Sequence, residues 1–164
     1  CLEVWGHLLG HDFPSTLASL DDAMSVDGSH LMRASVDFWP ASGMPSHVAH
    51  AERFRLARLW AGFLADHPVV VLPTWYQPPF DHHEDLTDDR DALRSLYDGV
   101  FTPIVPANLL GLPATQVPVG LGADGTPLGV QCLADRHRED VTLAAAAIVE
   151  AAFPPLTPID PATG

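Results

Sequence analysis

A five-residue apolar run, VVVLP at positions 69–73, constrains the fold of this chain more than any other feature. It has the length of a strand but no polar alternation, and such runs are typical of strands buried on both faces of an α/β sheet. Residues 45–66, directly before it, place apolar side chains at helical spacing behind a proline. This pattern predicts a long helix with a core-facing stripe. The stripe comprises Val48, Leu56, Leu59, Trp60, Phe63 and Leu64.

A second strand is indicated by ATQV at 114–117, although Pro113 and Pro118 flank it. Proline has no backbone N–H to donate to a ladder, so we expect a short strand that Pro118 ends. Asp124-Gly125 then indicates a hairpin-type turn into a third strand over 128–133.

Helices account for most of the remaining pattern. Residues 1–37 are mostly helical in pattern, with breaks expected at Pro14 and near Gly28. Further helices are predicted over 89–100 and 139–152. Helices that alternate with strands favour the α/β class, and 164 residues suffice for one domain with its own core.

The composition of the chain disfavours several classes of function. It carries 8 basic and 21 acidic residues, a formal net charge of -13, which disfavours binding to nucleic acid. All the basic residues are arginines, so a phosphate-binding loop that needs lysine is absent. No apolar run approaches the roughly 20 residues of a membrane-spanning helix, and we expect no membrane partner.

Candidate chemical motifs are weak. The acidic loop around His82-His83 is the densest group of metal-ligand types, but consecutive side chains diverge, so we predict a solvated loop and no metal. No serine lies in a G-x-S-x-G motif, and no cofactor motif is present. Two histidine pairs have helical spacing without the glutamate of a zinc-protease motif, His7/His11 and His47/His50.

The first residue, Cys1, and the helical spacing of the apolar residues after it suggest that the natural polypeptide starts further upstream. A processed lipoprotein and a hydrolase with Cys1 as nucleophile are the alternatives. Cys132, within an apolar run, is expected to be a small buried side chain. A cytoplasmic location is favoured.

Residues 101–150 resemble the C-terminal portion of the amidase-signature family. The similarity lies in TPIVPANLLGLPATQVPVGLGADGTPLGVQCL and in REDVTLAAAAIVEA. The helix that leads into VVVLPTW is also similar to a segment of that family. We therefore divide the chain into a helical part with weak similarity (1–44), a clearly similar part (45–153) and a loose tail (154–164), all within a single amidase domain.

The resemblance implies an α/β/α fold, with a mixed β-sheet flanked by helices, that hydrolyses carboxylic amide bonds without a cofactor. Catalysis in the family uses a serine, a second serine on a cis peptide and a lysine, all N-terminal to the part matched here. This chain contains no lysine. We therefore expect no catalytic residue within it, and no activity from the chain alone.

What the resemblance assigns to this chain is scaffold and one wall of the substrate pocket, formed by Phe101, Thr102, Val105 and Asn108. Core packing is an equally good interpretation of Phe101 and Val105. Phe101 stands where an aminoacyl-tRNA amidotransferase A subunit would carry an acidic residue, which disfavours that alternative. A non-catalytic binding module derived from the fold is a third. The expected partner is a small-molecule amide, with a homodimer left open.

Overall fold

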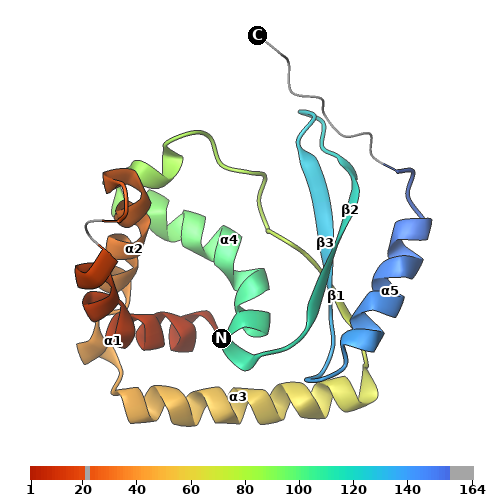
Figure 1. Ribbon diagram of the computed structural model, residues 1–164, viewed down its shortest axis with the longest axis horizontal. Helices are drawn as coiled ribbons and strands as arrows, with labels where there is room; N and C mark the ends of the chain where they lie inside the picture. The colour runs from red at the N-terminus through yellow and green to blue at the C-terminus, as the bar shows by residue number, and fades with distance from the viewer. Residues whose placement is uncertain (21–22, 156–164) are drawn as a thin grey trace.

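The computed structural model describes residues 1–20 and 23–155, and within them an α/β arrangement (Figure 1). The predicted fold class is confirmed. A three-stranded antiparallel sheet in the order β1-β3-β2 has α5 packed on β2 and β3, while α1, α2 and α4 gather on the other side and α3 spans the base. The main elements are α1 (Leu2–Leu20), α2 (Val26–Phe38), α3 (Ser46–Asp66), β1 (Val70–Pro73), α4 (Arg90–Leu110), β2 (Ala114–Leu121), β3 (Pro127–Leu133) and α5 (Glu139–Ala151).

Strand β1 differs from the expectation for residues 69–73. It lies at an edge of the three-stranded sheet, and its burial alternates along the strand, with Val71 51% exposed. The prediction that both faces are buried was wrong for the described residues. An apolar run specifies a strand, but the layers that cover it are set by the rest of the fold.

Strand β2 continues through Pro118, so the prediction that Pro118 ends it was wrong. The strand reaches Leu121, and its register with β3 shifts between Pro118 and Gly120. An edge strand with a bulge tolerates a proline because a missing N–H there need not break an inner ladder. The predicted turn is confirmed, since Gly125 has a φ of 83° and Asp124 accepts hydrogen bonds from the N–H and hydroxyl of Thr126.

Helix α4 is longer than predicted, because it runs past residue 100 and contains Pro103 and Pro106. Proline 103 cannot donate to the carbonyl of Gly99 four residues earlier. The N–H of Tyr76 bonds that carbonyl instead, at 2.9 Å. The helix ends at Gly111, which takes the left-handed conformation with φ 66°.

The N-terminal part is helical as predicted, but its breaks are placed differently. Pro14 lies inside α1, and Gly28 lies in the first turn of α2, where its N–H donates to the capping hydroxyl of Ser25 at 3.0 Å. The helix predicted over 139–152 is confirmed as α5. Most of the predicted tail, residues 156–164, lies outside the described residues.

Only part of the apolar stripe of α3 faces the core. Leu64 is buried, and Leu56 and Trp60 pack against the main core cluster. The exposed side chains of the stripe are Val48, Leu59 and Phe63. The predicted stripe was thus too wide by these three residues. None of the described helices, α3 included, combines the length and apolar character needed to cross a membrane.

Candidate functional site

The four predicted pocket-wall residues all lie on the second half of α4. Asp89 caps the start of this helix by accepting hydrogen bonds from the N–H groups of Asp91 and Ala92, at 2.9 and 3.1 Å. The left-handed Gly111 ends it. Both ends of the helix that carries the wall are therefore fixed by local sequence, through an aspartate cap and a glycine stop.

Phe101 and Asn108 meet on the same side chain, that of Trp5 in α1. The rings of Phe101 and Trp5 stack with centroids 5.3 Å apart, and Trp5 Nε1 donates to Asn108 Oδ1 at 2.8 Å. Phe101 also contacts Tyr97, one turn earlier, with centroids 5.0 Å apart. The structure thus joins two of the four residues through a tryptophan that sequence reasoning did not include.

The other two residues, Thr102 and Val105, differ in burial. Val105 is 1% exposed and belongs to a core cluster with Leu109, Leu110 and Leu133. Thr102 is exposed on the helix surface. Among the four, Thr102 and Asn108 therefore present polar atoms to solvent, while Val105 packs within the core. A wall role for the four residues remains a prediction.

The electrostatics around the aromatic cluster centre on Glu3. Its carboxylate accepts hydrogen bonds from Trp39 Nε1 at 2.8 Å and from Arg94 at 2.6 Å. Burial alone would raise the pKa of Glu3, but the bonds from Arg94 and Trp39 outweigh it and hold the pKa below its usual value. Burial raises the pKa of Tyr97, although its hydrogen bond with Ser35 opposes this. These groups fasten α1 and α2 to α4.

Gln131 is a buried polar residue to which the sequence analysis assigned no role. It is 5% exposed, and its Nε2 donates to the carbonyl of Pro103 at 2.9 Å, which ties β3 to α4. A second, longer contact of 3.4 Å reaches the carbonyl of Pro73 at the end of β1. The available signal was a single polar residue within an otherwise apolar strand, LGVQCL.

Residues 74–80, TWYQPPF, form the loop that follows β1. This loop forms one side of a groove of about 370 Å³. The rings of Trp75 and Phe80 stack at 5.8 Å with planes 9° apart. Sequence reasoning treated the surrounding segment as a loop and missed the groove, although paired aromatic residues beside prolines were a signal. Its lining includes Pro73, Thr74, Trp75, Gln116, Leu128 and Val130.

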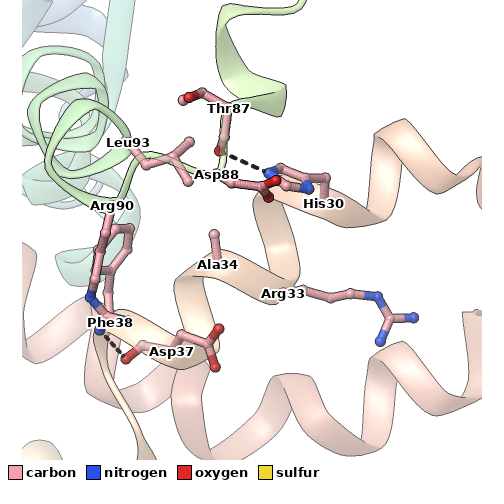
Figure 2. Close-up of a pocket in the computed structure, with 9 residues that line it drawn as sticks. All are labelled: His30, Arg33, Ala34, Asp37, Phe38, Thr87, Asp88, Arg90 and Leu93. Carbon is pink, nitrogen blue, oxygen red and sulfur yellow. Dashed lines mark hydrogen bonds between the residues drawn. The ribbon is translucent and has the colours of Figure 1, made fainter.

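A second hollow of about 310 Å³ lies between α2 and the start of α4 (Figure 2). Arg90 donates to the carbonyl of Asp37 at 2.8 Å and lies over the ring of Phe38, while a ring nitrogen of His30 bonds the carbonyl of Thr87 at 3.2 Å. The guanidinium of Arg33 points away from Arg90 (Figure 2). The polar groups here hold elements together and do not converge on a common point.

The histidines and cysteines of the described residues show no arrangement for binding a metal. His11 Nε2 bonds the carbonyl of Met44 at 2.8 Å, and Nδ1 of His7 is buried without a hydrogen-bond partner among the described residues. Within residues 1–20 and 23–155, histidine, cysteine and acidic side chains form no group of three suited to a metal. Cys132 is fully buried, as predicted, and burial raises the pKa of its thiol.

Comparison with known proteins places this chain in a family. The family model described as Amidase matches residues 41–143, more than half of the chain. Indoleacetamide hydrolase of Bradyrhizobium japonicum is 41% identical over 102 residues, which cover 62% of this chain and 22% of that protein. Fatty-acid amide hydrolase 2-A of Danio rerio is 44% identical over 170 residues, covering 92% of this chain and 31% of that protein.

A solved structure supports the same assignment at the level of fold. The structure of 6-aminohexanoate cyclic dimer hydrolase superposes with a TM-score of 0.60 at 24% identity, covering 93% of this chain and 35% of that one. The chain belongs to the amidase family, which confirms the resemblance found in its sequence. It spans well under half the length of these relatives.

Proposed function

We propose that this chain supplies the C-terminal part of an amidase that hydrolyses carboxylic amide bonds, acting as scaffold and as one wall of the substrate pocket. The family match over residues 41–143 carries the proposal, because it includes all of α4, β2 and β3. In this role Phe101 and Asn108 are held by Trp5, and the exposed Thr102 contributes its hydroxyl.

The catalytic nucleophile and base come from residues outside this chain in the proposal. The family resemblance assigns the base to a lysine, and the chain contains none. Without a base that takes the proton of the nucleophile, attack on an unactivated amide is slow. The chain alone is therefore proposed to be inactive, while its pocket wall positions the acyl part of the substrate.

The substrate is proposed to carry an apolar acyl group. Phe101 offers an aromatic ring where binding of the ammonium group of glutamine would need a carboxylate, so the amidotransferase alternative is disfavoured. Two relatives are named as hydrolases of indoleacetamide and of fatty-acid amides, both with apolar acyl groups. These names support the same substrate class for the assembled enzyme.

A chimera tests the proposal. The N-terminal part of the Bradyrhizobium indoleacetamide hydrolase, up to the position equivalent to Cys1, is joined to residues 1–164 of this chain, so that Trp5 is retained. Ammonia release is measured with indole-3-acetamide, phenylacetamide and L-glutamine. We expect turnover of the first two substrates by the chimera and none by the chain alone. The relative itself serves as the positive control, and circular dichroism establishes that the chimera is folded.

Three results would contradict the proposal. A folded chimera that releases no ammonia from any amide would show that this chain does not complete an amidase. Turnover by residues 1–164 alone would show that a catalytic group lies within the chain. Preference of the chimera for L-glutamine would favour the amidotransferase alternative.

A further inference from the structure

We propose that the groove between residues 74–80 and strands β2 and β3 binds an aromatic acyl group of the amide substrate. The inference rests on the proposed function and extends it from an apolar acyl group to a single aromatic ring system. The groove is lined by Trp75 and Gln116, and it has a volume of about 370 Å³. This volume is at the small end of the roughly 300–1,000 Å³ of ligand pockets, which suits one ring system better than a long chain.

The loop that forms one side of the groove is fastened at its start. The N–H of Thr74 donates to the carbonyl of Gly129 at 3.2 Å, and the N–H of Tyr76 donates to the carbonyl of Gly99 at 2.9 Å. The second bond exists because Pro103 leaves the Gly99 carbonyl without its helical donor. Because the backbone is anchored by Thr74 and Tyr76, on either side of Trp75, the groove is formed before a ligand binds. A preformed site lowers the entropic cost of binding.

The same anchor connects the groove to the predicted pocket wall. Gly99 lies within one turn of Thr102 and near the same side of α4, whereas Phe101 and Asn108 lie on the side that contacts Trp5. The Gln77 side chain packs so tightly on Gly99 that an added Cβ would overlap its Oε1. The loop therefore follows α4 closely on the side of Gly99 and Thr102, so Thr102 is the wall residue that lies toward the groove.

The walls of the groove are suited to an aromatic ring. Trp75 is stacked on Phe80 with nearly parallel planes, which fixes the plane of the indole. Leu128 and Val130 supply aliphatic contacts from β3. Aromatic pairs in stacked or edge-to-face geometry are more favourable than the burial of their area alone predicts, so a ring gains more here than an alkyl chain does.

One polar group stands at the edge of the groove. Gln116 Oε1 accepts a hydrogen bond from the hydroxyl of Thr74 at 2.6 Å, so its Nε2 is the end that can donate. Nε2 packs directly on Gly129, where a Cβ would overlap it. Because Gly129 has no side chain, the Gln116 amide can lie close to its backbone at the groove, where the amide N–H groups can donate to a polar atom of the ligand.

Titration of the whole chain, labelled with ¹⁵N at its tryptophans, tests binding without catalysis. Phenylacetamide is the probe, with acetamide and dodecanamide as comparison compounds, and the Trp75 indole N–H is assigned by Trp75→Phe. We expect phenylacetamide alone to shift the Trp75 signal. Equal shifts of all tryptophan signals, or no shift of Trp75 at millimolar phenylacetamide, would overturn the inference.

Kinetics of the chimera provide the second measurement. Trp75→Ala is expected to lower kcat/KM for phenylacetamide about threefold to tenfold while leaving acetamide unchanged, and Trp75→Phe to retain most of the activity. Phe54→Ala, which removes an exposed ring from α3, is the matched control with no effect. Equal losses for both substrates would overturn the inference with the proposed function intact. A folded chimera inactive on all amides would overturn the function, and the titration would still decide the groove.

Discussion

The two sides of this molecule are held together by different kinds of contact. On one side, β2 and β3 pair through a backbone ladder over most of their length, and prolines and glycines set the ends and irregularities of the elements. On the other side, α1 and α2 are fastened by side chains, above all by the rings of Trp5 and Trp39. The family match covers the first side and begins, at residue 41, after α2 has ended.

Helix α4 is the joint between the two sides. Its Phe101, Asn108 and Arg94 contact α1, while the carbonyls of Gly99 and Pro103 accept hydrogen bonds from the loop after β1 and from β3. The predicted wall residues therefore lie on an element that contacts both sides. Removing a stabilising contact on either side is expected to displace the wall residues. The decrease in the free energy of unfolding is expected to differ between the two sides.

The largest expected effect is on the helical side, from Trp39→Ala. Trp39 is 1% exposed, packs against Trp5 and Tyr97, and donates a hydrogen bond to Glu3. Removing the buried ring should lower the free energy of unfolding by about 3–5 kcal/mol, measured by urea denaturation. Hydrogen exchange should show loss of protection in α1 and α2 before β2 and β3.

Phe54→Ala is the control for this variant, because its ring is 61% exposed. We expect a change below about 0.5 kcal/mol. If Trp39→Ala reduced protection equally in the helices and in the strands, the two sides would form a single cooperative unit, and the comparison between them would not hold.

A smaller effect is expected at the joint from Gln131→Ala. The substitution leaves the buried Pro103 carbonyl without the donor that β3 supplies, which should cost about 1–3 kcal/mol of unfolding free energy. Gln116→Ala is the matched control, because it removes a glutamine of the same sheet face that is exposed. Similar losses in the two variants would show that the bond from Gln131 to α4 does not stabilise the joint.

The smallest effect is expected from the ion pair of Glu3. Because its folded pKa is lowered, the contribution to stability is present above the pKa of the unfolded carboxyl and is lost as pH falls through the folded value. The pair with Arg94 is largely exposed, so the contribution should be at most about 1 kcal/mol. Glu3→Gln should flatten the acid limb of stability against pH, and an unchanged acid limb would contradict this.

The sequence predicted the elements where the signal is local. The turn at Asp124-Gly125, helix α5 and the existence of all three strands follow from turn chemistry, capping and apolar runs. It failed where a distant group supplied what the local sequence lacked. Pro103 would be expected to disrupt a helix, but the N–H of Tyr76 satisfies the carbonyl that the proline leaves free.

The candidate site divides in the same way. Phe101, Thr102, Val105 and Asn108 could be named from the family resemblance, because that signature is continuous in sequence. Trp5, Gln131 and the Trp75–Phe80 pair could not, since they come from segments far from α4 and are placed by packing. The burial of Val105 was likewise beyond the sequence, since an apolar residue on a helix suits a core as well as a pocket.

The sequence by itself determined the family, the α/β class and the absence of lysine, because each depends only on residue identity and local pattern. The tertiary structure alone decided that β1 lies at an edge of the described sheet, that α4 continues through two prolines, and that residues 74–80 form a groove beside it. These features depend on hydrogen bonds and ring contacts between segments distant in the chain, whose geometry no local pattern specifies.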